Sequence, residues 1–274
     1  MNDIYNEMLN AYDLSTEQSV RNATYEISQQ IILSGLSQGG FFDIAALYGG
    51  TCLRVFHGLD RYSEDMDFTL LSPDASFSFT KYFQPIVDEF AYIGRNVEIR
   101  RKSKSQQSRV ESAFLKDTTD IYDISFQTNR SIKIKIEVDV MPPLAFSTEY
   151  KLLLQPRSSM VRCLVLPDLF AGKLHALVYR GWKRRVKGRD WYDFEWYVRH
   201  NVPVNYAHLH ERIREFNGKD VSKEDFQALL KERLSTTDIR TVKADVLPFV
   251  RKPHDLDIWT NDYFLHLASM MRFQ

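Results

Sequence analysis

The stretch R-Y-S-E-D-M-D-F, residues 61–68, leads into a short apolar run. The run predicts a β-strand, in which residues two apart project from the same side. Asp65 and Asp67 should therefore project together, while Met66 and Phe68 enter the core. Two neighbouring carboxylates repel each other, and a cation between them relieves the repulsion. Mg²⁺, with Mn²⁺ as a substitute, binds such oxygen ligands together with substrate phosphates. An isolated D-x-D is also common as a plain acidic turn.

Upstream, the stretch G-G-T-C-L-R, residues 49–54, predicts a turn from a short strand into a helix. Glycine lets a backbone approach a phosphate closely, and a helix N-terminus presents free N–H groups to an anion. Gly50, Thr51 and Arg54 are therefore candidate contacts to a nucleotide. Arg61 could pair either with phosphate or with the two carboxylates. The alternative is an ordinary strand-to-helix turn that binds nothing.

A second strand offers a third carboxylate. Between residues 131 and 140, isoleucine and valine alternate with Lys133, Lys135, Glu137 and Asp139, which predicts one apolar and one charged face. Glu137 would complete a metal site with the two aspartates, suited to displacement at phosphorus. Alternating Lys and Glu is also typical of a solvated edge strand. The pattern leaves open whether Glu137 or Asp139 is the third ligand.

A basic segment follows in the C-terminal part. Residues 180–189 contain six basic residues and no acidic one, namely Arg180, Lys183, Arg184, Arg185, Lys187 and Arg189. Lys173 precedes the segment, and Asp190 and Asp193 follow it on one face of a predicted helix. The segment, with Arg100, Arg101, Lys102 and Lys104, predicts a local site for RNA or for a triphosphate. A solvated loop is the alternative, and the aspartates could instead cap the helix.

Around these motifs the hydrophobic periodicity predicts an α/β protein. Strands are expected near residues 44–48, 66–71, 96–101, 119–126 and 131–140, and helices near residues 15–38, 49–57, 79–92, 167–180, 191–199, 206–216, 223–234 and 262–271. A capping-box pattern at residues 15–18 should start the first long helix. We expect a nucleotide-binding core with a mixed sheet over residues 1–155. An all-α domain over residues 156–274 should complete the active site.

The composition excludes several classes of protein. The chain has 274 residues with 36 basic and 36 acidic side chains, so any polyanion site must be a local patch. Its two cysteines do not indicate a disulfide framework, which favours a reducing compartment. No apolar stretch approaches the length of a membrane span. We therefore expect a cytoplasmic protein without a membrane partner.

Taken together, four motifs resemble those of the AbiEii-type nucleotidyltransferases, toxins of bacterial toxin–antitoxin and phage-abortive-infection systems to which the mycobacterial MenT toxins are related. The matching stretches are residues 49–54 with 61–68, K-I-E-V at 135–138, K-L-H-A-L at 173–177 and K-G-R-D-W-Y-D at 187–193. The resemblance implies a DNA polymerase β-like core fused to a helical domain, with NTP as substrate. Thr51 stands where the wider superfamily has serine, and its hydroxyl is retained.

The resemblance also implies roles for single residues. Asp65 and Asp67 would bind the metal, and Lys173 would contact the triphosphate. Asp190 and Asp193 would belong to the catalytic residues. Ser63 and Arg189 join Gly50, Thr51 and Arg54 as candidate nucleotide-binding residues.

Three functions remain open at this point. The first is the transfer of a nucleotide to RNA, with a tRNA 3′ end as acceptor, by a toxin that a cognate antitoxin neutralises. The second is nucleotide transfer to a protein or small molecule. The third is a nucleotide-binding module without turnover. The sequence does not specify the NTP, the oligomeric state or the mode of neutralisation.

Overall fold

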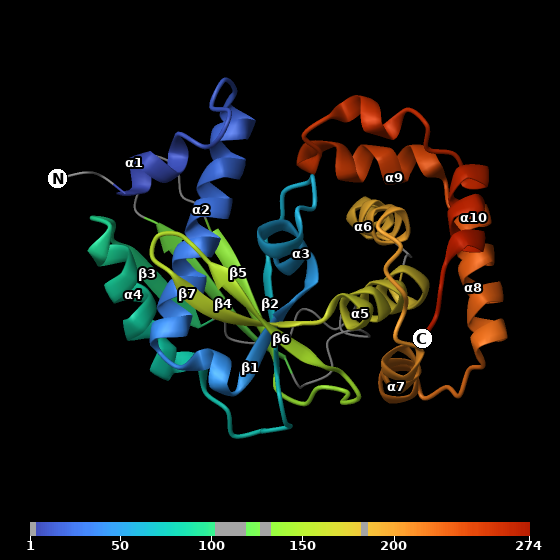
Figure 1. The fold of residues 1–274 in the computed structure, drawn as a ribbon, viewed down its shortest axis with the longest axis horizontal. Helices are drawn as coiled ribbons and strands as arrows, with labels where there is room; N and C mark the ends of the chain where they lie inside the picture. The colour runs from blue at the N-terminus through green and yellow to red at the C-terminus, as the bar shows by residue number, and fades with distance from the viewer. Residues whose placement is uncertain (1–3, 102–118, 127–132, 182–185) are drawn as a thin grey trace.

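The computed structural model describes residues 4–101, 119–126, 133–181 and 186–274. Figure 1 shows a sheet-bearing N-terminal half beside a half built of helices. The seven strands are β1 (Ala45–Tyr48), β2 (Met66–Leu70), β3 (Val97–Arg101), β4 (Thr119–Phe126), β5 (Lys133–Asp139), β6 (Thr148–Leu153) and β7 (Ser159–Leu164). Their order across the sheet is β3-β4-β5-β2-β1-β7-β6.

The sheet is mixed, as the sequence predicts. Strand β2 pairs parallel with β5 and antiparallel with β1, and β1 pairs parallel with β7. The register places Asp67 of β2 opposite Glu137 of β5 and opposite Tyr48 of β1. Because side chains alternate along a strand, these three residues project from one face of the sheet. The apolar residues next to them along each strand project from the opposite face of the sheet.

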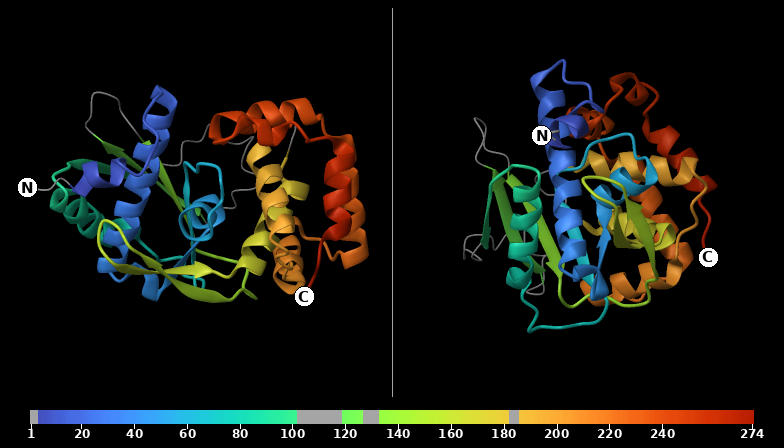
Figure 2. Two further views of the ribbon diagram at one scale, coloured as in Figure 1. Left: turned by 45° about the horizontal axis from the view of Figure 1, so that its top comes forward. Right: turned by 60° about the vertical axis from the view of Figure 1, so that its left-hand side comes forward.

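The helices of the N-terminal half are α1 (Ile4–Leu9), α2 (Glu17–Gln38), α3 (Gly49–His57) and α4 (Phe83–Tyr92), with short 3-10 turns η1 (Phe41–Asp43) and η2 (Phe79–Tyr82). Helices α2 and α4 cross closely beside the sheet (Figures 1 and 2). A Cβ on Gly35 would lie 2.8 Å from the Cα of Ile86, so this crossing requires glycine. The rings of Phe41 and Phe68 pack edge-to-face beneath them, 5.1 Å apart.

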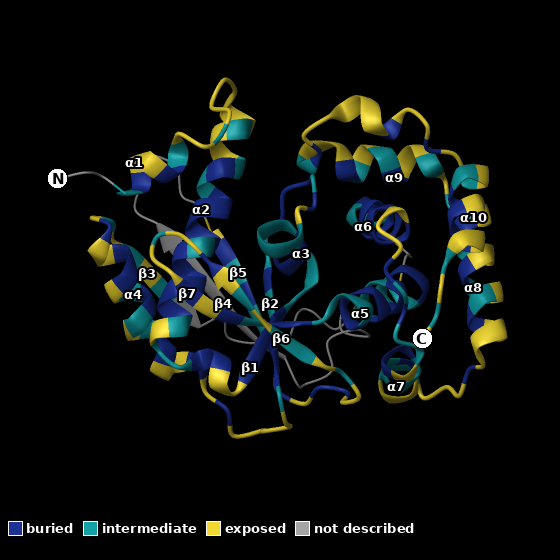
Figure 3. Cartoon of the chain, viewed as in Figure 1, coloured by how far each residue is buried: buried dark blue, intermediate teal, exposed yellow. Residues whose placement is uncertain are grey.

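The C-terminal half consists of α5 (Leu166–Tyr179), α6 (Gly188–Arg199), α7 (Tyr206–Asn217), α8 (Lys223–Thr236), α9 (Ile239–Val246) and α10 (Asn261–Met270), with turns η3 (Leu247–Phe249) and η4 (Pro253–Leu256). Helix α6 lies at the centre and is buried along almost its whole length, whereas the outer helices expose one face (Figure 3). Within α6, buried Glu195 accepts hydrogen bonds from the Trp259 indole (2.7 Å) and the Tyr263 hydroxyl (2.6 Å). These two bonds tie the central helix to the segment that leads into α10 and to α10 itself.

The structure confirms all five expected strands and the expected helices, and it adds α1, β6, β7 and α9. The first long helix is capped by Thr16, whose side chain pairs with Ser19, and not by the residues at 15 and 18. The expected boundary at residue 155 falls inside the β6–β7 hairpin. Because β7 pairs with β1, the sheet-bearing half extends to Leu164 and the helices follow from α5. None of the helices in the described ranges is long and apolar enough to cross a membrane.

Candidate active site

Three acidic side chains gather where β2 begins. Asp67 and Glu137 are register partners on adjacent strands, and Asp65 lies just before β2. Burial raises the pKa of Asp67 to about 7, with repulsion from Glu137 and Asp65 adding to the rise. Lys187 and Lys173 act in the opposite direction. The expected clustering of the three carboxylates is therefore present, and the nearby lysines offset their mutual repulsion only in part.

Two glycines allow the turn above these carboxylates. Gly49 has φ +76°, and a Cβ there would lie 2.5 Å from Oδ2 of Asp67. A Cβ on Gly50 would lie 2.9 Å from the Arg61 guanidinium and 3.0 Å from the Ser63 hydroxyl. Both positions therefore exclude other residues, because a side chain would displace the groups beside them. The glycines are needed for this packing whether or not a phosphate also approaches.

The hydroxyl of Thr51 has a different partner from the one expected. Thr51 is fully buried, and its Oγ1 donates a 2.5 Å hydrogen bond to the backbone carbonyl of Asp65. Arg54 likewise turns away from the carboxylates. It pairs with Glu26 of α2 at 2.6 Å and donates to the carbonyl of Leu59. Thr51 and Arg54 thus attach α3 to the loop before β2 and to α2. The spacing of residues along a single helix could not predict these contacts.

A buried ionic network joins the loop before β2 to the two central helices. Arg61 forms a bidentate pair with Asp193 of α6, at 2.7 and 2.6 Å. Lys173 of α5 contacts both Asp190, at 2.8 Å, and Asp193, at 2.7 Å. Arg61 is 2% exposed and both aspartates are fully buried. The structure thus brings together Lys173, Asp190 and Asp193, which the sequence predicted as site residues, and shows that Arg61 pairs with a carboxylate.

The cations of this network determine the charge of Asp190 and Asp193. Burial acts to raise the pKa of Asp190, but Lys173, Arg180 and Lys187 together hold it well below its usual value. Burial also opposes ionisation of Asp193, and Arg61 and Lys173 lower the pKa of that carboxyl in the same way. Both aspartates are therefore charged at neutral pH. They act as fixed counterions to the cations around them.

Further cations surround this network. Burial lowers the pKa of Lys187 to about 8, and neighbouring Arg180 adds to the effect. The Arg180 Nε lies 3.6 Å from Asp190. Arg189 packs its guanidinium over the Phe249 ring at 4.2 Å and lies 3.4 Å from Glu64. The sequence placed Lys187 in the basic segment and in the K-G-R-D motif but gave it no role of its own.

The basic segment is divided by these contacts. Arg180, Lys187 and Arg189 turn inward beside Asp190 and Glu64, whereas Lys183, Arg184 and Arg185 lie outside the described residues. Lys102 and Lys104 also lie outside them, and of Arg100 and Arg101 only the backbone is described. The described part of the segment therefore contributes positive charge to the carboxylate site itself.

Glu137 and Asp139 differ in their surroundings. Glu137 faces Asp67 and pairs with Lys135 on its own strand. Asp139 lies opposite Thr69 and lines a small, partly open cavity with Arg212 and His208. Within the described ranges, no three His, Cys, Asp or Glu side chains are arranged ready to hold an ion. Lys135 neutralises part of the charge of Glu137 in the protein without a metal.

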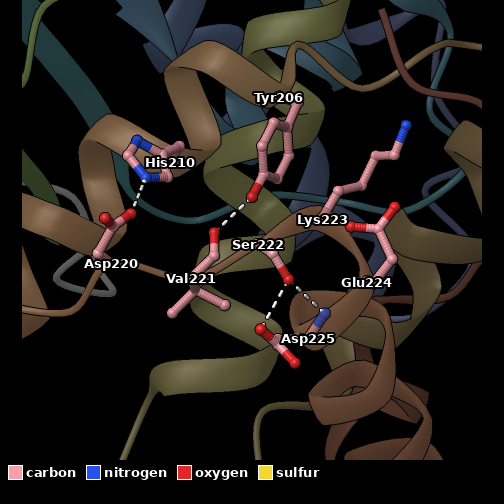
Figure 4. Close-up of a pocket in the computed structure, with 8 residues that line it drawn as sticks. All are labelled: Tyr206, His210, Asp220, Val221, Ser222, Lys223, Glu224 and Asp225. Carbon is pink, nitrogen blue, oxygen red and sulfur yellow. Dashed lines mark hydrogen bonds and ion pairs between the residues drawn. The ribbon is translucent and has the colours of Figure 1, made fainter.

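A separate open hollow of about 740 Å³ lies between α7 and the start of α8 (Figure 4). In it, His210 contacts Asp220 at 2.7 Å, and the Tyr206 hydroxyl donates to the carbonyl of Val221. Its lining includes Asp220, Glu224 and Asp225 and none of the residues of the carboxylate site. Acidic walls do not suit a triphosphate, so the hollow is not a candidate nucleotide site.

Comparisons with known proteins identify a family and a shared fold. The family model described as nucleotidyl transferase AbiEii toxin, type IV toxin–antitoxin system, matches residues 31–266. Among solved structures, the chain is similar to MenT4, a nucleotidyltransferase toxin from Mycobacterium tuberculosis H37Rv, with 14% identity, coverage of 97% of this chain and 87% of that one, and a TM-score of 0.62. It is also similar to JHP933 from Helicobacter pylori, with 18% identity, coverage of 93% and 90%, and a TM-score of 0.52.

These identities show a shared fold alone, and no curated protein sequence matches the chain. The family model, in contrast, spans most of the chain, from the second half of α2 to α10. The chain therefore belongs to the AbiEii family of nucleotidyltransferase toxins of type IV toxin–antitoxin systems.

Proposed function

We propose that the protein transfers an NMP unit from an NTP to the 3′ end of a tRNA, with Mg²⁺ held by Asp65, Asp67 and Glu137. The observation that carries the metal assignment is the register of β2 and β5, which places Asp67 beside Glu137, with Asp65 two residues before Asp67. Burial and the repulsion from Glu137 and Asp65 raise the pKa of Asp67 accordingly. Oxygen donors of this kind suit Mg²⁺, and Mn²⁺ as a substitute. The ion, when bound, would offset the repulsion and polarise the phosphate oxygens.

The cations on the helices supply the second half of the proposed site. Lys187 and Arg180 bind the triphosphate, which brings negative charge towards a positively charged wall. Asp190 and Asp193 hold Lys173 in place, so its positive charge is already positioned before the nucleotide binds. In the transfer step, the acceptor hydroxyl oxygen attacks the α-phosphorus, and pyrophosphate leaves. The residues of this chain contribute by holding the reacting groups in line.

Membership of the family implies an NTP substrate and a cognate antitoxin. We infer that the acceptor is RNA because the basic segment gives a chain of zero net charge a local cationic surface. Its inward residues suit the triphosphate. The tRNA backbone would then contact Lys183, Arg184 and Arg185, which continue the segment. The same activity would make the protein a growth inhibitor in the cytoplasm and a component of phage defence.

The experiment is to incubate the purified protein with each labelled NTP, Mg²⁺ and total RNA, and to ask which nucleotide enters which RNA. Label that enters protein, or no RNA product with any NTP, would reject the RNA acceptor. In parallel, replacing Lys183, Arg184 and Arg185 by alanine should flatten the dependence of tRNA binding on salt. Nucleotide binding should persist in this triple variant.

The metal ligands are tested by a matched pair on one strand. Glu137→Gln and Asp139→Asn each remove one charge from the same face of β5, two residues apart. We expect Glu137→Gln to lower metal-dependent transfer by about 10²-fold or more, because it removes the carboxylate opposite Asp67. Asp139→Asn should retain most of the activity. Equal losses in the two variants, measured at saturating Mg²⁺, would reject Glu137 as the third ligand.

A further inference from the structure

One buried amide contacts the backbone of the loop that carries the metal-binding aspartates. Gln29 lies in α2 and is fully buried. Its Nε2 donates to two consecutive backbone carbonyls, those of Ser63 at 2.9 Å and Glu64 at 3.2 Å. A primary amide has two N–H donors, so one nitrogen can satisfy both carbonyls. Helix α2 thereby reaches the residues just before Asp65.

The next carbonyl in the chain is held from the other side. The hydroxyl of Thr51, in α3, donates to the carbonyl of Asp65 at 2.5 Å. Three successive carbonyls, of residues 63–65, are thus bound by two buried side chains from two helices. Since the carbonyls are fixed, the peptide planes of the loop are fixed as well. The direction in which the Asp65 side chain leaves the backbone follows from those planes.

The contact is specific to an amide. The carbonyls can accept only, so the nitrogen of Gln29 must face them, and Oε1 faces away. Within the described ranges, Oε1 has no hydrogen-bond partner. A buried polar atom without a partner costs free energy. The unpaired Oε1 indicates that the two hydrogen bonds to the loop stabilise the protein by more than this cost. A purely apolar side chain would fill the same space without that cost.

We propose that Gln29 is a positioning residue that sets the geometry of Asp65 and Asp67 for binding the divalent cation. The inference rests on the proposed function for the identity of the ligand. Gln29 lies in α2, two residues before the part of the chain that the family model matches. The site of this protein therefore extends to a helix that none of the sequence motifs contains.

A matched pair of variants tests the proposal. Gln29→Met has nearly the length of glutamine but has no donor, so the carbonyls of Ser63 and Glu64 lose their partner. Gln30→Met makes the same change at the next position of α2, where the amide donates to the Tyr12 hydroxyl at 3.2 Å and does not contact the loop. Mn²⁺ binding to each purified protein, measured by electron paramagnetic resonance without nucleotide, gives a readout that does not depend on turnover.

We expect Gln29→Met to bind Mn²⁺ about tenfold more weakly than the wild type, a change that corresponds to about 1.4 kcal/mol. Gln30→Met should bind as the wild type does. In the transfer reaction, Gln29→Met should require more Mg²⁺ for half-maximal rate and should recover much of its kcat at saturating Mg²⁺. A general loss of stability would lower the Tm without this shift in metal requirement.

The outcomes distinguish an error in the role of Gln29 from an error in the metal site. Equal Mn²⁺ affinity in Gln29→Met and the wild type would overturn the role of Gln29 and leave the metal site standing. A wild-type protein that binds no Mn²⁺ would overturn the metal site and this inference with it. If Gln29→Met does not fold, Gln29→Leu replaces it. This variant also lacks a hydrogen-bond donor and adds no charge, and wild-type affinity in it would equally overturn the proposal.

Discussion

The carboxylates on the sheet and the carboxylates in the helices are held in opposite electrostatic states. Asp67 is surrounded by Glu137 and Asp65, and burial together with their repulsion raises its pKa to about 7. Asp190 and Asp193 are buried more deeply, yet Lys173 and the nearby arginines keep the pKa of each carboxyl below its usual value. Burial is common to both groups. The charges of the neighbours make the difference.

This difference assigns separate tasks to the two groups. The helical network is compensated within the protein, so it contributes to a fixed framework in the absence of any ligand. The sheet group is compensated only in part, by Lys135 beside Glu137, and a bound cation would favour the charged form of Asp67. Sites that bind a ligand commonly keep such unfavourable charges. Removing a carboxylate from each group should therefore have opposite effects on stability.

The largest effect is expected for Asp67→Asn. Loss of this carboxylate should lower transfer by about 10²–10³-fold, the scale seen when an electrostatic group leaves an active site. The metal-free variant should be at least as stable as the wild type, because a repulsion has been removed. Transfer of labelled NMP and thermal unfolding in a chelator measure the two properties. A marked fall in Tm would show that Asp67 belongs to the framework instead.

The counterpart in the helices is Asp193→Asn. This change leaves Arg61 buried without its bidentate partner, and breaking a buried pair from one side costs roughly 3–5 kcal/mol. Urea unfolding should show the loss in the variant. Asp262→Asn, on the exposed surface at the start of α10, is the matched control and should stay within about 0.5 kcal/mol of the wild type. Similar stability in both variants would contradict the idea of a framework.

A smaller effect should appear in the pH dependence of stability. The pKa of Asp67 in the folded protein, about 7, lies above its ordinary value of 3.8, so the folded state holds a proton that the unfolded state has released. This contribution is complete below about pH 4 and is lost as the pH rises through 7, with a slope of up to about 1.4 kcal/mol per pH unit. Mg²⁺ should abolish the slope because it favours the charged carboxylate.

Buried histidines act in the opposite direction over the same range. Burial lowers the pKa of His175 and His208 to about 3, so their contribution to stability is lost as the pH falls below 6.5. The measurement is therefore a difference between the wild type and Asp67→Asn, in which the histidine contributions cancel. Denaturant midpoints at several pH values between 4 and 8, in a chelator, provide it. Parallel curves for the two proteins would show that Asp67 does not titrate in this window.

Local patterns in the sequence predicted the parts of the fold that depend on local structure. The alternation in residues 131–140 correctly gave β5, and the D-x-D stretch correctly gave β2. Strands β6 and β7 were missed because their exposed faces interrupt the apolar pattern. Leu152 is 55% exposed, and Lys151 and Glu149 lie beside it. Only pairing with β1, more than a hundred residues upstream, identifies this hairpin as part of the sheet.

In the site, too, local features could be predicted from the sequence and long-range contacts could not. The residues that supply charge were visible in the sequence, and the structure brings Lys173, Asp190 and Asp193 together as the motifs suggested. The partners that fix them were not visible. Arg61 lies 132 residues from Asp193. Arg54, one helical turn from the glycines, was expected to bind nucleotide but pairs with Glu26, because the direction of a side chain depends on tertiary packing.

The ion pair between Arg61 and Asp193 also determines what a truncated gene product can form. A stop codon between positions 62 and 192 yields a chain that contains Arg61 but lacks Asp193, its buried counterion. Such a product also lacks helices α7 to α10, so it cannot assemble the site.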